Sequence, residues 1–263
     1  MATYENIEFS IQNNIATIAL NRPDRLNALS TGLKRDFLSA VRSLALDASD
    51  VRALLITGNG RAFSAGADLD ATTADFGNID LAQSLIDDYH PLMLELANLE
   101  IPVVSAVNGI AAGAGMSIAI SADIVIAARS AYFLQAFVNI GLVPDSGSTF
   151  ILPRLIGNAR ATAMMMLGEK VMAETALEWG MIAEVVDDND LTARATQIAT
   201  RLANGPTKAI SGIRQLIAAS MKSNYAEQLQ LEAVVQRKMG LSKDCIEGVT
   251  AFFEKRPAKF IGS

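Results

Sequence analysis

The chain has few of the residues that build disulfides, metal centres and nucleophilic sites. Its 263 residues include one cysteine, Cys245, and one histidine, His90. A single cysteine excludes an intramolecular disulfide framework and fits a reducing compartment. It has no histidine near it in the sequence, so an inert role is more common than a nucleophilic one. One histidine and scattered carboxylates make no ligand cluster, and we therefore expect no metal.

Sorting and membrane signals are also missing. The N-terminus, residues 1–6, has neither a basic nor a hydrophobic region, so we predict no signal peptide and expect a cytoplasmic enzyme. One apolar stretch, residues 110–128, is about long enough to cross a bilayer. It contains Asp123 and several glycines, and residues 123–127 resemble a strand. We predict a buried helix followed by a buried strand.

Positive charge is in the minority, with a formal net charge of −6. This balance disfavours a nucleic-acid surface. An anionic ligand would need a local basic cluster, either Arg22 with Arg25 or Lys255 with Arg256 and Lys259. Each of these residues taken singly is more simply explained as a solvated surface charge.

What the chain has in quantity is apolar sequence, 51% of its residues, in a length that suits one α/β domain with a helical appendage. Strand and helix patterns alternate through the first two-thirds, and the remainder is helical. Strands are predicted at 7–11, 15–20, 51–57, 103–107 and 123–127, and a loop at Asp70–Asp80. Helices are predicted at 33–46, 81–99, 148–155, 159–167, 173–179, 191–204, 206–219, 225–239 and 243–253.

Three short segments carry the chemistry. Residues 63–68 and 111–117 are rich in glycine and alanine and follow buried strands, so their backbone N–H groups can approach a ligand closely. Residues 142–147 place a lone carboxylate, Asp145, in an apolar stretch. Two amide donors facing one carboxylate can stabilise an enolate while a proton moves beside a thioester carbonyl.

Each segment also has a structural interpretation. Small-residue turns after strands are commonly structural, and tight helix packing explains residues 113–115 equally well. Asp145 follows Pro144 and could cap the next helix, which is a frequent role for aspartate. From the residues alone the catalytic and capping interpretations of Asp145 are about even.

Taken together, these segments resemble the enoyl-CoA hydratase/isomerase (crotonase) family over nearly the whole chain. The resemblance extends to residues 21–29, 102–126, 140–147, 173–180, 185–186 and 252–256. It implies a ClpP-like spiral of ββα units as the acyl-CoA-binding catalytic core, residues 1–200, and a helical oligomerisation region, residues 201–263. It also implies a homotrimer, or a hexamer of two trimers, with coenzyme A entering as part of the substrate and no permanently bound cofactor.

The same resemblance assigns site residues. The amides of Ala67 and Ala114 would hold the thioester oxygen. Ala28, Ala65 and Asp68 would line the coenzyme A groove, and Lys255 or Arg256 would approach its phosphates, from an adjacent subunit in one arrangement. The other substrate-binding residues expected are Gly66, Gly113, Ser117, Phe137 and Leu142.

The catalytic residues depart from the hydratase pattern in an informative way. Hydratases of the family carry glutamates where this chain has Ser117 and Phe137, and hydration needs one group to activate water and another to deliver a proton. Asp145 remains, at the position where the ring-1,2-epoxyphenylacetyl-CoA isomerase branch carries its acid/base. The resemblance therefore favours an enoyl-CoA isomerase with Asp145 as proton shuttle.

Alternatives stay open. An enoyl-CoA hydratase could work through Asp145 and an ordered water. A non-catalytic acyl-CoA binder is also consistent with the absence of both hydratase glutamates. An aryl-CoA dehalogenase of the family pairs an aspartate at the Asp145 position with a histidine at the His90 position, but Phe137 and Ala67 replace its bulkier aromatic residues. The identity and length of the acyl group cannot be read from the sequence.

Overall fold

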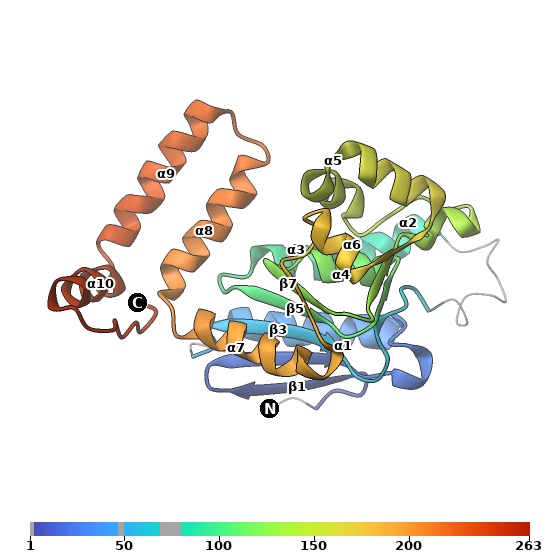
Figure 1. Cartoon of the computed structure of the whole chain (residues 1–263), viewed down its shortest axis with the longest axis horizontal. Coiled ribbons are helices and arrows are strands. Elements are labelled where there is room, and N and C mark those ends of the chain that lie inside the picture. The colour runs from blue at the N-terminus through green and yellow to red at the C-terminus, as the bar shows by residue number, and fades with distance from the viewer. Residues whose placement is uncertain (1–2, 47–49, 69–79) are drawn as a thin grey trace.

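The computed structural model describes residues 3–46, 50–68 and 80–263 (Figure 1). The predicted loop Asp70–Asp80 lies outside the described residues except for Asp80, whose carboxylate accepts from Gln83 N and caps the next helix. The chain begins with the hairpin β1 (Ile7–Gln12) and β2 (Ile15–Leu20), paired in antiparallel register. Asn13 and Asn14 both have positive φ, as a two-residue hairpin turn requires.

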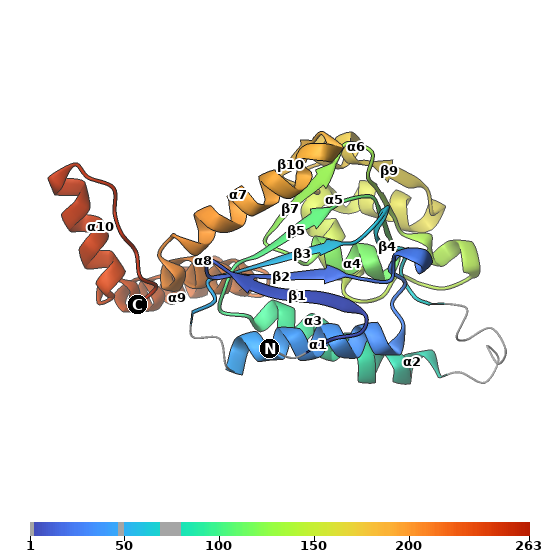
Figure 2. The ribbon, with the colours of Figure 1, turned by 90° about the horizontal axis from the view of Figure 1, so that it is seen from below.

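The larger sheet has the strand order β1-β2-β3-β5-β7-β10 and is parallel from β2 onward. Its further strands are β3 (Ala53–Gly58), β5 (Val103–Val107), β7 (Ile124–Ala128) and β10 (Glu184–Val186). Strand β5 is buried at every position, because helices cover both faces of a parallel sheet. In Figure 2, α7 (Leu191–Ala203) lies over one face, and α1 (Thr31–Leu46) and α3 (His90–Asn98) lie beneath the other.

A smaller sheet has the order β4-β6-β8-β9 and consists of three-residue strands. They are β4 (Ala62–Ser64), β6 (Ile110–Ala112), β8 (Tyr132–Leu134) and β9 (Lys170–Met172). These strands were not predicted, because three residues are too few to show a periodicity. The predicted helix and strand within residues 110–128 are confirmed as α4 (Ala114–Ile120) and β7, with β6 added before them.

The two sheets are joined by a repeated unit. Each unit runs from a strand of the large sheet to a short strand of the small sheet and on to helix: β3-β4, β5-β6 and β7-β8 in turn. The helices that follow are α2 (Leu81–Ser84) with α3, then α4, then α5 (Ser148–Leu167). The expected α/β spiral of ββα units is confirmed.

Three predicted helices differ in detail. The segment 81–99 contains a π-helical turn, η4 (Leu85–Tyr89), between α2 and α3. The two helices predicted at 148–155 and 159–167 form one element, α5, bent at Gly157, which has φ 79°. No helix within the described ranges is long and apolar enough to span a membrane.

The last helices stand apart from the two sheets. After α6 (Ala173–Glu178) and α7, the chain forms α8 (Thr207–Ser220), α9 (Tyr225–Gly240) and α10 (Lys243–Glu254), which project to one side in Figures 1 and 2. Arg214 of α8 anchors them by binding the Asp123 carboxylate at 2.7 Å and the carbonyls of Leu96 and Leu99. Arg52 adds a second anchor through Thr207 and the carbonyls of Gly205 and Phe260.

Candidate active site

The repeated unit brings the three predicted segments to one edge of the small sheet. Strands β4, β6 and β8 are neighbours and parallel, so their carboxyl ends lie at the same edge. The first strand is followed by residues 65–68, the second by Gly113 and Ala114, and the third by residues 135–147, which include Asp145. Segments about 40 residues apart in the sequence therefore become neighbours at the candidate site.

The first of these turns is held in place by Asn27. This side chain is fully buried, and its amide donates to the carbonyls of Ala62 (2.7 Å) and Asn59 (3.0 Å). Ser64 Oγ donates back to the Asn27 carbonyl at 2.8 Å. Leu29 N then bonds Gly66 O at 2.8 Å. The residues that follow β4 are thus tied along their length to the segment that follows β2.

The turns that carry Ala67 and Ala114 touch through their glycines. A Cβ atom on Gly66 would lie 2.8 Å from the Ala112 carbonyl oxygen and 3.6 Å from Ala114 N. Gly66 has φ +91° and Gly113 has φ +51°, a region that side chains rarely adopt. Within the described part of the chain, neither the Ala67 N–H nor the Ala114 N–H donates a hydrogen bond. Two unpaired amides therefore lie on adjoining turns.

Asp145 lies just before α5, and its backbone carbonyl and its side-chain carboxylate have different hydrogen-bond partners. Its backbone carbonyl accepts hydrogen bonds from Ser117 Oγ (3.2 Å), Ser148 Oγ (3.0 Å) and Ser148 N (3.1 Å). Among the described residues, its carboxylate accepts only from Ser146 Oγ, at 2.9 Å. Helix α5 begins at Gly147 as N-cap without any side-chain cap. The backbone of Asp145 is fixed, while its carboxylate is left available, and the capping interpretation is wrong.

Burial raises the pKa of the Asp145 carboxyl above its usual value. The hydrogen bond from Ser146 and the charges of His90 and Lys34 oppose this rise without cancelling it. His90 itself is exposed. Nothing in the sequence indicated that Lys34 and Ser146 contribute to this balance.

The residues expected around the acyl group are divided between two positions. Phe137 is buried with its ring about 3.7 Å from the Cβ position of Gly113, so it lies against the second amide turn. Leu142 is half-buried and donates its N–H to the Phe137 carbonyl. Ser117 is fully buried and contacts the backbone of Asp145. The structure therefore shows Ser117 supporting Asp145, a contact that its sequence position did not indicate.

The residues expected to line a coenzyme A groove lie in the first turn, residues 65–68, or beside it. Asp68 forms an ion pair with Arg22 at 2.7 Å, and Arg22 also donates to the Ala28 carbonyl at 2.6 Å. Ala28 is buried and Ala65 is half-buried beside them. Lys255 is different. It is exposed at the end of α10, in the helical projection opposite α2 and α5 in Figure 1, and this chain does not bring it to Asp145.

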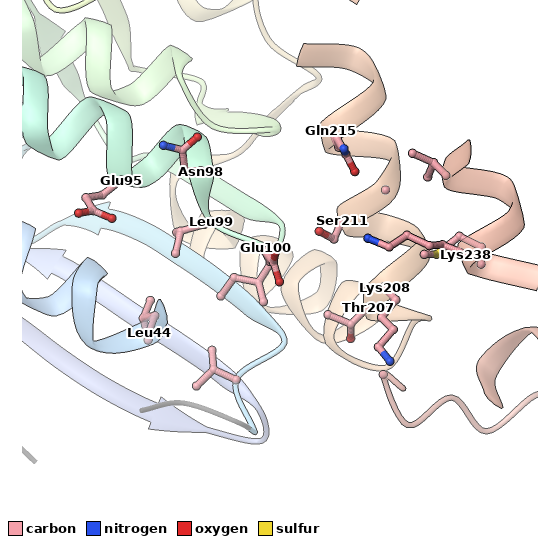
Figure 3. Close-up of a pocket in the computed structure, with 16 residues that line it drawn as sticks. Leu44, Glu95, Asn98, Leu99, Glu100, Thr207, Lys208, Ser211, Gln215 and Lys238 are labelled. Atoms are coloured by element: carbon pink, nitrogen blue, oxygen red, sulfur yellow. The ribbon is translucent and has the colours of Figure 1, made fainter. Parts of the chain in front are cut away.

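A cavity also lies away from these residues. A space of about 830 Å³ opens between the end of α3 and helices α8 and α9 (Figure 3). Its wall includes Glu95, Glu100, Lys208 and Lys238, and none of Ala67, Ala114 or Asp145 borders it. Because none of the residues predicted to act on the substrate borders this cavity, we place the candidate active site at the edge of the small sheet. The described ranges contain no group of His, Cys, Asp and Glu that could hold a metal ion.

Comparison with known proteins identifies the family. The model of the enoyl-CoA hydratase/isomerase family matches residues 10–263. The chain belongs to the enoyl-CoA hydratase/isomerase family. It is 44% identical to the 1,2-epoxyphenylacetyl-CoA isomerase of Escherichia coli strain K12 over 96% of this chain and 97% of that protein. It is 31% identical to the 2,3-dehydroadipyl-CoA hydratase of the same organism over 96% and 97%.

A solved enoyl-CoA hydratase/isomerase from Cupriavidus metallidurans CH34 has the same fold, with a TM-score of 0.92 and 29% identity over 100% of this chain and 98% of that one. The present chain is therefore an enzyme of a family that acts on CoA thioesters. Relatives of both kinds, isomerase and hydratase, match it over nearly their full length. The choice between the two activities has to come from the site.

The contact between the two amide turns gives a first prediction. Replacing Gly66 with alanine forces a Cβ atom against the Ala112 carbonyl at a positive φ, so the Ala67 and Ala114 amides must move apart. We expect a loss in kcat/KM of about 100-fold or more, the effect of losing one oxyanion donor. Steady-state kinetics on an enoyl-CoA measures it. Gly240→Ala is the control, because nothing lies within 4 Å of its Cβ position. Parental kcat/KM in Gly66→Ala would contradict this interpretation.

Proposed function

We propose that this protein is an enoyl-CoA isomerase in which Asp145 is the proton shuttle and the Ala67 and Ala114 amides bind the thioester oxygen. One observation carries the proposal. The Asp145 carboxylate, which caps no helix and has a raised pKa, lies at the same edge of the small sheet as the amides of Ala67 and Ala114, which donate to no described residue. Ser117 and Phe137 occupy the positions where the resemblance places the hydratase glutamates, and neither side chain can act as a carboxylate base.

The geometry supports a one-base mechanism. With a 3-enoyl-CoA, the ionised Asp145 takes a proton from the α-carbon, breaking that C–H bond and forming an O–H bond. The electron pair delocalises over the acyl chain into the thioester oxygen, where the amides of Ala67 and Ala114 stabilise the charge. Protonated Asp145 then returns the proton to the carbon two positions further along. The double bond moves to the 2,3-position, and the enzyme is restored.

The environment of Asp145 suits both halves of this cycle. A carboxylate of ordinary pKa is a weak base, and partial burial strengthens it. The hydrogen bond from Ser146 and the charges of His90 and Lys34 limit the rise in the pKa of Asp145. The three hydrogen bonds to the Asp145 carbonyl keep the residue in place while its carboxyl moves the proton.

Substrate binding extends from this centre in two directions. The acyl group would contact Phe137, Leu142 and the backbone of Gly66 and Gly113. The coenzyme A portion would follow Ala28, Ala65 and Asp68 along the segment joined to the first turn. These assignments are supported by the burial of Phe137 and Ala28 and by the close approach of the backbone at Gly66, where a Cβ atom would lie 2.8 Å from the Ala112 carbonyl oxygen.

We also propose that residues 201–263 form an oligomerisation region in a homotrimer or a hexamer of two trimers. The segment from α8 to α10 exposes several large apolar side chains, including Ile213, Leu241, Phe252 and Phe253. A partner would cover these side chains and fill the hollow beside α8 and α9. Lys255, remote from Asp145 in its own chain, could then reach the coenzyme A phosphates of a neighbouring subunit.

Enoyl-CoA hydration is the second candidate, because a relative of 31% identity is named as a hydratase. It would require an ordered water that Asp145 both activates and supplies with a proton. Within the described part of the chain, Ser146 Oγ is the one group that forms a hydrogen bond with the Asp145 carboxylate, and no second carboxylate bonds to it. Isomerisation needs one carboxylate and is the better fit.

The proton-shuttle role predicts the result of one isosteric substitution. Asp145→Asn keeps the shape and the Ser146 contact but removes the base, so we expect kcat on a 3-enoyl-CoA to fall by about 10²–10⁴-fold. Wash-in of solvent deuterium at the α-carbon should disappear with it, while acyl-CoA affinity stays within a few-fold. Asp190→Asn, an exposed carboxylate remote from the site, is the control. A pure binder would show no deuterium exchange in the parent protein, and parental turnover in Asp145→Asn would exclude Asp145 as the base.

The raised pKa predicts the pH dependence. Only ionised Asp145 can accept the proton, so kcat/KM should decrease as the pH falls through the pKa of this group. Because burial raises that pKa, the decrease should be centred above about 3.9, the value of an exposed aspartate. Initial rates across the acid range, with recovery of activity at pH 7 as a check on folding, measure the midpoint. A midpoint at or below the exposed value would contradict the proposed environment.

A further inference from the structure

The turn that carries Ala67 continues into a carboxylate. Asp68 follows Ala67 directly, and its side chain is only 12% exposed. The proposed reaction places a negative charge on the thioester oxygen at the Ala67 amide. A carboxylate one residue away would oppose that charge, because like charges repel more strongly where water is partly excluded. Enolate formation at this turn is therefore favoured by a cation that compensates Asp68.

Arg22 supplies a cation at this place. Its guanidinium group donates to the Asp68 carboxylate at 2.7 Å and to the Ala28 carbonyl at 2.6 Å. Its backbone N–H donates to Asn27 Oδ1 at 2.8 Å, and its carbonyl accepts from Asn27 N at 2.9 Å. These hydrogen bonds fix Arg22 to the segment that also holds the turn after β4.

The backbone between Arg22 and the turn is bent to make these contacts. Leu26 has φ 51° and Asn27 has φ 55°, a left-handed conformation that residues other than glycine rarely adopt. Strain of this kind persists where surrounding contacts hold it, and it is frequent at functional sites. Here the Leu26 carbonyl accepts from Ala65 N at 2.9 Å. The strained bend is thus joined to the turn at one end and to Arg22 at the other.

The Arg22–Asp68 ion pair is more buried than several others in the described part of the chain. The Arg22 side chain is 22% exposed, whereas Arg129 and Arg194 are more than a third exposed in their own ion pairs. Exposed ion pairs contribute little to stability. In a partly buried pair, removal of one partner leaves the other as an uncompensated charge. Loss of Arg22 would therefore leave a negative charge beside Ala67.

We propose that Arg22 is a positioning residue of the active site, which holds the Asp68 carboxylate toward residues 22–28 and cancels its charge so that the enolate can form at the Ala67 amide. The inference rests on the proposed function. It gives Asp68 a role as the partner of Arg22, in addition to its place beside the proposed coenzyme A groove.

A pair of substitutions tests the charge compensation. Arg22→Gln keeps a hydrogen-bond donor but leaves Asp68 uncompensated, so we expect kcat on a 3-enoyl-CoA to fall by about ten-fold. Adding Asp68→Asn removes the remaining charge, and the double variant should recover most of this loss. Circular dichroism and thermal unfolding establish that each variant is folded when its kcat is measured. A double variant no faster than Arg22→Gln would overturn the inference, because damage to the fold does not reverse when a second substitution is added.

The carbonyl stretch of a bound saturated acyl-CoA, isotope-labelled at the thioester carbon, measures the same effect without turnover. Amide donors at the thioester oxygen lower its frequency. Arg22→Gln should reduce this lowering and Asp68→Asn alone should increase it, although both break the same ion pair. Changes of the same sign in the two variants would contradict the inference. Asp68→Asn is isosteric, so a frequency shift smaller than the parental one in this variant contradicts it even where Arg22→Gln does not fold.

Arg194→Gln is the matched control. Arg194 forms an ion pair with Glu184, also at 2.8 Å, but this pair joins α7 to β10 of the large sheet. Parental kcat and carbonyl frequency are expected in this variant. Failure of the proposed function would appear separately. A parent protein in which the bound thioester shows no lowering lacks the amide site, and the inference falls with it. A lowering in the parent that persists unchanged in Arg22→Gln overturns the inference alone.

Discussion

The close approach of two backbone turns, at Gly66 and Gly113, is the constraint on which the rest of the site depends. A Cβ atom on Gly66 would lie 2.8 Å from the Ala112 carbonyl oxygen, so the two turns pack directly against each other. The amides of Ala67 and Ala114 on these turns donate to no described residue. The turns meet because β4, β6 and β8 are adjacent and parallel and end at one edge. Asn27, itself fully buried, ties the first turn to the segment after β2. A fold made of repeated ββα units thus creates a pair of donors that need no functional side chain.

The second contribution is a carboxylate held by its backbone. The hydroxyls of Ser117 and Ser148 donate hydrogen bonds to the Asp145 carbonyl. The Asp145 side chain does not cap α5 and is partly buried. Lys34, Asp88 and Tyr89 form a charged cluster next to it, in which one cation serves an ion pair and an aromatic ring together. Burial raises the proton affinity of Asp145 and the cation limits that rise. Such a balance suits the proton shuttle that we propose for Asp145.

Much of this could be predicted from the sequence, and the exceptions have physical reasons. The alternating pattern of β1 and β2 and the helical periodicity of Leu33, Phe37 and Val41 were sufficient to place those elements, because burial on one face fixes the spacing of apolar residues. The three-residue strands of the small sheet have no such periodicity, yet they create the site edge. The π turn at Leu85–Tyr89 leaves the helical pattern nearly unchanged, so the inward position of Tyr89 could not be read from it. The contact of Ser117 with Asp145 likewise joins residues 28 positions apart and depends on the packing of α4 against the segment before α5.

The central claim is that a thioester oxygen binds between two backbone amides with Asp145 beside the adjacent carbon atoms. The most direct test is a crystal structure of the protein with a saturated acyl-CoA, which binds without reacting. We expect the thioester oxygen within about 3 Å of both Ala67 N and Ala114 N, and the Asp145 carboxylate facing the first carbons of the acyl chain. A thioester oxygen that contacts neither amide, or a carboxylate turned away from the acyl chain, would contradict the account.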